Sequence, residues 1–116
     1  MSKSSTTTEA RSGPSKGLRV FPPIHPGEML REEFLVPLGM TPYALARRLN
    51  VPRTRIERLV REETGLTPET ALRLARFFGS TPEFWLNMQQ RYELTLAEME
   101  SAEAIEAIEP LHADVA

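Results

Sequence analysis

The chain has 116 residues and a mass of 13.1 kDa; 41% of its residues are hydrophobic and 26% are charged. These values fit one globular domain and exclude a fibrous or wholly disordered chain. There is no cysteine, which excludes disulfides and cysteine-bound zinc, and two histidines cannot form a metal cluster alone, so we expect no cofactor. The sequence has neither a secretory signal nor an apolar run of about eighteen residues, so we expect a cytoplasmic protein that does not enter a membrane.

The net charge of −2 conceals two segments of opposite sign. Residues 41–61 contain six arginines and one glutamate, a local charge of about +5. Residues 93–109 contain six glutamates and no base, a local charge of about −6. The basic segment favours a polyanionic partner, and the acidic segment would be repelled by that partner. Both segments could also be solvated helix faces, so the spacing of the residues has to decide.

The N-terminal part of the chain is predicted to lack a core of its own. Residues 1–20 are mostly Ser, Thr, Gly, Lys and Arg, and we predict a disordered arm. With its net charge of about +3, this arm could contact DNA or a protein partner, although a flexible tail without a partner is the simpler interpretation. Three prolines between Phe21 and Pro26 predict an extended lead-in. A first helix is then expected over residues 28–35, with acidic residues in its opening turns and a stop near Pro37-Leu38-Gly39.

Three later helices are predicted to begin at the same dipeptide, Thr-Pro. Threonine supplies an N-cap oxygen, and proline is favoured at the first helical position. These three helices are predicted over residues 42–49, 68–78 and 82 onwards. A further helix is predicted between the first two, over about residues 52–62. Thr95 and Glu98 could form a capping box that interrupts the last helix. No segment has the clear alternation of a strand, so the fold is predicted to be all-α.

The helix predicted over residues 52–62 has an apolar back and a basic front. At 100° per residue, Ile56, Leu59 and Val60 share one face. The opposite face carries Thr54, Arg58 and Arg61. Two short helices joined by a tight turn, the second of them basic on its exposed face, can place a helix in the major groove of DNA. The spacing therefore predicts a helix-turn-helix DNA-binding domain.

Individual roles follow from position on these two helices. Arginine can bind guanine O6 and N7 together, so Arg58, with Thr54 and the first-turn Arg53, is predicted to read bases. Arg55 and Arg61 flank this face and could contact phosphates or a neighbouring base. Arg47 and the Thr41 hydroxyl at a helix N-terminus are candidates for phosphate binding. Glu57 could accept a hydrogen bond from cytosine N4, but pairing with Arg53 or Arg61 is the simpler interpretation.

The last helix carries a stripe of large apolar residues that step by 3, 4, 4 and 3: Trp85, Met88, Tyr92, Leu96 and Met99. Phe84 and Trp85 could form a stacking platform for bases, but core or dimer contacts suit their helical spacing better. The candidate dimer anchors are Phe84, Trp85 and Met88.

The sequence also closely resembles HigA-type antitoxins, the VapI-like or plasmid-maintenance antidote group of XRE helix-turn-helix proteins. The resemblance covers residues 21–96, and it is most specific at His25-Pro26-Gly27-Glu28, at Leu45-Ala46 with Leu49, and at Thr81-Pro82-Glu83-Phe84-Trp85-Leu86. It implies a five-helix, lambda-repressor-like domain over residues 21–96, followed by a C-terminal helical extension or tail over residues 97–116. It also implies a homodimer on a palindromic operator, repression of its own operon, and neutralisation of a RelE-like, messenger-RNA-cleaving ribonuclease toxin of the HigB type.

The chain departs from the family pattern at the start of the basic helix. Family members often carry Ser, then Gln next but one, then Asn three further on, where this chain has Pro52, Thr54 and Glu57. The operator sequence is therefore not carried over from the family. A regulator without a toxin partner, and a module whose basic helix binds an acidic protein, remain alternatives. An enzyme is not expected, because nucleophile, metal set and paired carboxylates are missing.

Two further features keep a structural and a functional interpretation. His25 and Glu28 are three residues apart and could share a catalytic site, but shaping the entry to the first helix is the simpler role. The glutamates of residues 93–109 could face a basic toxin or form a solvated helix face that keeps this end off DNA.

Overall fold

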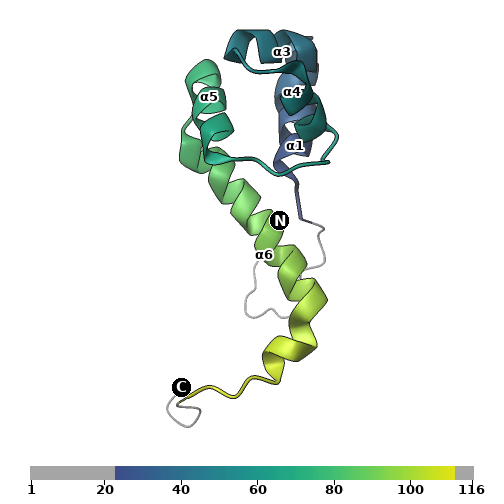
Figure 1. Ribbon diagram of the computed structural model, residues 1–116, viewed down its shortest axis with the longest axis vertical. Helices are drawn as coiled ribbons and strands as arrows, with labels where there is room; N and C mark the ends of the chain where they lie inside the picture. Colours follow the sequence, from purple (N-terminus) through teal and green to yellow (C-terminus); the bar gives the residue numbers. More distant parts are fainter. Residues whose placement is uncertain (1–22, 112–116) are drawn as a thin grey trace, which may run out of the picture.

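The computed structural model describes residues 23–111. These residues form α1 (Pro26–Met29), η3 (Leu30–Leu35), α2 (Val36–Leu38), α3 (Pro42–Leu49), α4 (Arg53–Val60), α5 (Pro68–Phe78) and α6 (Pro82–Glu106). Because α1, η3 and α2 follow one another without a break, the described residues form five helices, and the all-α prediction is confirmed. The helices α1 to α5 gather into a head, and α6 extends away from it as a long stem (Figure 1). The predicted arm, residues 1–20, lies outside the described residues.

The first helix begins slightly earlier than predicted, and it ends where a stop near Pro37-Leu38-Gly39 is expected. It begins at Pro26 because the buried His25 is its N-cap: the Nδ1 atom accepts a hydrogen bond from the N–H of Gly27 at 2.9 Å. It continues past Leu35 to Leu38 although Pro37 lies within it. The turn before Pro37 is a π-helix, η3, whose wider winding accommodates a residue that has no N–H to donate.

The three Thr-Pro helix starts are confirmed. The threonine side chains accept hydrogen bonds from the N–H groups of Ala44, Thr70 and Phe84, at 3.0, 3.3 and 3.1 Å. Both α3 and α5 have the predicted bounds, and α6 begins where predicted. Only α4 is shorter than the predicted 52–62, because Pro52 is its N-cap and the chain turns into the left-handed region at Glu62, where φ is 63°.

The break considered at Thr95 does not occur. Helix α6 continues through Thr95, and its distortion lies instead at Ser101, with φ −118° and ψ 18°. A capping threonine needs extended backbone, and propagation of the helix from its preceding turns keeps Thr95 helical. None of the helices in residues 23–111 combines the length and the apolarity that crossing a membrane requires.

Trp85 connects α6 to the core of the head. Its side chain is 0% exposed, and its indole N–H donates a hydrogen bond to the Ser80 hydroxyl at 2.9 Å. The ring lies 5.1 Å from that of Phe34 and 5.0 Å from that of Phe84, measured between ring centres. Burial of a tryptophan among aromatic rings, with its N–H bonded, holds the start of the stem rigidly against the head.

Candidate DNA-binding site

Helices α3 and α4 form the two arms of a helix-turn-helix, joined by a tight turn. The turn begins at Asn50, whose φ of 61° is left-handed, and the N–H of Val51 bonds to the carbonyl of Ala46 at 3.0 Å. Asparagine is one of the few residues other than glycine that adopt this conformation readily. Behind the turn, the buried faces of both helices pack together: Leu45, Ala46 and Leu49 from α3, and Ile56, Leu59 and Val60 from α4.

The first helix sets the position of α4 from behind. A Cβ atom added at Gly27 would overlap the backbone carbonyl of Leu59, so only glycine lets the two helices approach this closely. Arg31 then covers the C-terminal end of α4: its guanidinium donates to the carbonyl of Val60 and pairs with Glu62 at 3.4 Å. The His25-Pro26-Gly27-Glu28 motif therefore has a structural role: it lets the first helix pack closely against α4, the helix that carries the basic front.

His25 has a structural place in the fold. Its ring packs against Tyr92 of α6 at 4.8 Å between ring centres, while its Nδ1 atom caps α1. Burial lowers the pKa of His25, and the nearby Glu62 only partly opposes this, so the side chain is neutral at neutral pH. In the described part of the chain, no three His, Cys, Asp or Glu side chains come together as a metal site would need.

The angular prediction for α4 is confirmed as far as exposure is concerned. The side chains of Arg53, Thr54, Arg58 and Arg61 are exposed, opposite the buried apolar face. Glu57 pairs with Arg53, Nε to Oε2 at 3.4 Å, which confirms the pairing expected for that glutamate. Thr41 is exposed at the start of α3, and Arg47 is exposed near its end. The contacts of these residues with DNA stay a prediction.

Arg55 is engaged in a way that the sequence did not indicate. Its guanidinium pairs with Glu69 of α5 at 2.7 Å, and Glu69 also binds Arg73 at 2.8 Å. Arg73 in turn donates to the carbonyl of Leu49 at 2.8 Å, so this network joins the end of α3 to α4 and α5. Hydrogen bonds from Arg73 and Arg55 lower the pKa of Glu69. A DNA contact by Arg55 would have to compete with this pairing.

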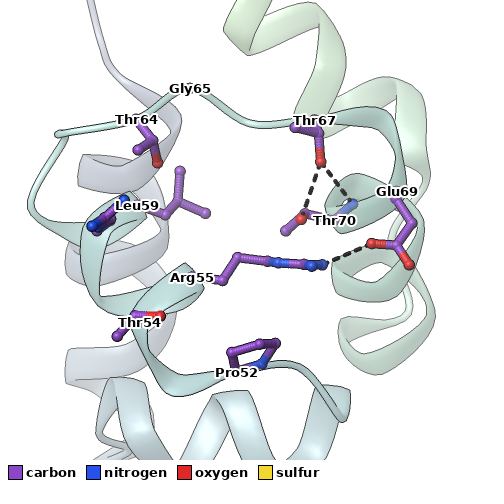
Figure 2. Close-up of a pocket in the computed structure, with 10 residues that line it drawn as sticks. Pro52, Thr54, Arg55, Leu59, Thr64, Gly65, Thr67, Glu69 and Thr70 are labelled. Atoms are coloured by element: carbon purple, nitrogen blue, oxygen red, sulfur yellow. Dashed lines mark hydrogen bonds and ion pairs between the residues drawn. The ribbon is translucent and has the colours of Figure 1, made fainter.

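A pocket of about 420 Å³ lies between α4 and the start of α5 (Figure 2). Two of the predicted base-reading residues, Thr54 and Arg58, are among its lining residues, and Arg55 crosses it to reach Glu69. The loop above it is fastened to α6 by Gln89, which accepts a hydrogen bond from the N–H of Leu66 at 2.8 Å. The pocket is therefore a fixed feature beside the basic front of α4.

Tyr43 is a further residue of this surface that the sequence analysis missed. It lies in the first turn of α3 and is 49% exposed. The guanidinium carbons of Arg47 and Arg53 lie 6.0 and 5.6 Å from its ring centre, within the range of cation–π attraction. The spacing from Tyr43 to Arg47 is a helical i, i+4 pair, a signal that could have identified it. One aromatic ring thus lies between an arginine of α3 and an arginine of α4.

The three predicted dimer anchors have different surroundings. Trp85 is fully buried within a single protomer, which assigns it to the core, one of the two roles considered for it. Met88 is half-buried, and Phe84 is 42% exposed. Phe84 lies 6.5 Å from Phe34 of η3 between ring centres.

Comparison with known proteins places this geometry in a family. The helix-turn-helix family model matches residues 30–86, from the start of η3 into α6. Antitoxin HigA-1 of Vibrio cholerae is 39% identical over 89 residues, which cover 77% of this chain and 84% of that protein. This chain belongs to the HigA antitoxin family of XRE helix-turn-helix proteins.

Other HigA-like relatives agree in sequence and in structure. Virulence-associated protein I of Dichelobacter nodosus is 49% identical over 98 residues, covering 84% of this chain and 90% of that protein. The solved structure of the Pseudomonas aeruginosa antitoxin HigA with the higBA promoter is 43% identical, with a TM-score of 0.74. The similarity covers 77% of this chain and 98% of that one. The HigA family and fold predicted from the sequence are confirmed.

Proposed function

We propose that this chain is a DNA-binding antitoxin that represses its own operon and neutralises, by direct binding, a RelE-like, messenger-RNA-cleaving ribonuclease toxin of the HigB type. The observation that carries the DNA-binding half is the basic front of α4, whose arginines are exposed while its apolar back is packed into the head. Support also comes from the P. aeruginosa HigA relative, whose structure contains promoter DNA. The toxin-binding half rests on membership of the antitoxin family.

In this proposal, α4 enters the major groove and reads bases with Arg58, Thr54 and Arg53. Arg47 and the N-terminus of α3 at Thr41 bind backbone phosphates on one side of the groove. On the other side of α4, the exposed Arg61 supplies a phosphate contact. Arg55 keeps its pairing with Glu69 and acts mainly by holding α4 in place.

A palindromic operator requires two copies of α4 related by a two-fold axis, with their centres about 34 Å apart. We propose that the homodimer forms around Phe84 and Met88, together with the exposed Val36 and Leu38 at the end of the first helix. These side chains offer an apolar surface, as dimer contacts require. Trp85 supports this surface from inside the protomer.

The antitoxin half is tested by growth of cells that express the small reading frame adjacent to this gene, with and without this protein. We expect arrest by the neighbouring gene product alone and recovery on co-expression. Arrest that this protein does not relieve, or no arrest at all, would contradict the antitoxin function and leave a regulator without a toxin partner. Binding of the operator upstream of the gene is measured separately and decides the DNA-binding half.

A further inference from the structure

The second half of α6 has no partner within the described residues. Of the 25 residues of α6, only Trp85 and Gln89 are buried, and both lie in its first third. Tyr92, which packs on His25, marks the end of the contact with the head. Beyond it the helix extends away from the other elements, at the opposite end of the molecule from α3 (Figure 1). The 14 residues of α6 after Tyr92 lack this contact, and an unpacked helical segment of that length is marginal in water, so a partner for it is expected.

Residues 93–109, the distal part of α6 and the three residues that follow it, are called the distal α6 segment, and their exposed surface combines two kinds of side chain. Six are glutamates, and the segment has no basic residue. Between the glutamates lie four large apolar side chains, Leu94, Met99, Ile105 and Ile108, each more than half exposed. Exposed apolar groups on a protruding, unpartnered element are typical of an interaction surface.

The charge of the segment indicates which kind of partner binds to it. A local charge of about −6 repels DNA and also repels a second copy of the same segment, because the pair would carry about −12. A protein surface with an excess of Lys and Arg is attracted. We propose that the distal α6 segment binds the positively charged, RNA-binding surface of the ribonuclease toxin and occupies it in place of RNA. This inference rests on the proposed antitoxin function and specifies where and how it acts.

The chemistry of the two ligands is matched. A ribonuclease holds RNA with basic side chains against phosphates and with apolar or aromatic side chains against bases. Carboxylates of the segment take the place of phosphates, and side chains such as Met99 and Ile105 take the place of bases. Because the distal α6 segment lies far from α3 and α4, toxin binding leaves the basic front of α4 free for DNA. Toxin and operator can then be bound at the same time.

The test compares two fourfold variants of the full chain. The distal variant E98Q/E100Q/E103Q/E106Q removes four charges from the segment with little change in shape. The matched control E28Q/E33Q/E63Q/E83Q removes four exposed carboxylates from other surfaces. The probe is the purified toxin encoded beside the gene, and the measurements are its affinity for each variant at low and high salt, its cleavage of messenger RNA, and operator binding.

We expect the distal variant to bind the toxin about 10- to 100-fold more weakly and to lose most of its salt dependence, while the control binds like the wild type. Both variants should bind the operator normally. A distal variant that binds and inhibits the toxin like the wild type would overturn the inference and leave the antitoxin function standing. A wild-type chain that does not bind the toxin would contradict the antitoxin function itself, and the inference with it.

The apolar variant M99Q/I105Q separates a toxin surface from a contact between two copies of this chain. Glutamine keeps the helix propensity of the segment while it removes the apolar groups. We expect toxin affinity to fall at least about tenfold and the dimer to persist in light-scattering measurements. A variant that becomes monomeric but still binds the toxin normally would show that a second copy covers the segment, and would overturn the inference.

Discussion

Glu69 pairs with Arg55 at 2.7 Å, and this ion pair joins the recognition helix, α4, to α5. The same carboxylate binds Arg73, which also bonds to the backbone at the end of α3. One acidic side chain therefore holds the three helices around the DNA-binding surface in register. It also keeps the guanidinium of Arg55 paired, beside a surface on which Thr54, Arg58 and Arg61 are exposed.

The substitution Glu69→Gln tests both effects of Glu69, the connection between the helices and the pairing of Arg55. The substitution removes the charge that holds Arg55, so we expect a slightly lower melting temperature and a free guanidinium next to the DNA. If Arg55 then contacts a phosphate, the slope of log K against log salt for duplex DNA steepens by about 1. Fluorescence anisotropy at several salt concentrations measures this slope. An unchanged slope would show that Arg55 is placed too far from the backbone to contribute.

Gly27→Ala tests whether the first helix positions α4. The added methyl group overlaps the carbonyl of Leu59, so we expect a loss of about 1 to 3 kcal/mol of folding free energy and weaker operator binding. Gly39→Ala is the matched control, because that glycine has no neighbour within 4 Å but a φ of 63°. It should cost about 1 to 2 kcal/mol and leave operator affinity intact in the folded protein. Equal effects of both substitutions on DNA binding would refute this role of Gly27.

We expect the ring of Tyr43 to hold the guanidinium groups of Arg47 and Arg53 in positions from which they contact DNA. Tyr43→Ala removes the ring on which both guanidinium groups lie, and we expect operator affinity to fall by roughly 0.5 to 2 kcal/mol. Tyr43→Phe keeps the ring and should keep most of the affinity. Comparing both variants by anisotropy distinguishes stacking from the hydroxyl group: a loss that is as large for phenylalanine would assign the contact to the hydroxyl.

Trp85 and Phe84 are adjacent in sequence but should respond differently to truncation. Trp85→Ala empties a fully buried site, and we expect a loss of about 3 kcal/mol or more in folding free energy. Phe84→Ala removes a partly exposed ring, and we expect a folded chain with a weaker dimer. Thermal unfolding and light scattering report the two outcomes. A Phe84→Ala chain that dimerises normally would contradict the proposed dimer contact at Phe84.

The sequence predicted the helices well where local chemistry decides them. The Thr-Pro starts at residues 41, 67 and 81 are set by capping, which involves only neighbouring residues. The exposed front of α4 followed from 100° spacing for the same reason. The break considered at Thr95 does not occur, because capping competes with helix propagation, and local pattern alone does not reveal which of the two prevails.

What the sequence did not reveal depends on contacts between residues far apart in the chain. Arg55 and Glu69 are separated by fourteen positions, and no spacing rule connects them. Gly27 meets Leu59 only once α1 has packed on α4, so the reason for glycine there is visible only in the fold. Trp85 belongs to an apolar stripe whose helical spacing suits a buried core and a dimer contact equally. Only the burial of its side chain distinguishes these two roles.

The most direct measurement compares Arg58→Ala with the wild type on the operator upstream of the gene and on unrelated duplex DNA. We expect operator affinity to fall by about 1 to 3 kcal/mol, roughly 5- to 150-fold, with a much smaller change on unrelated DNA and an unaltered fold. Arg91→Ala, which removes an exposed arginine from α6, should leave both affinities unchanged. Operator affinity that is the same for Arg58→Ala and the wild type would contradict base reading by α4.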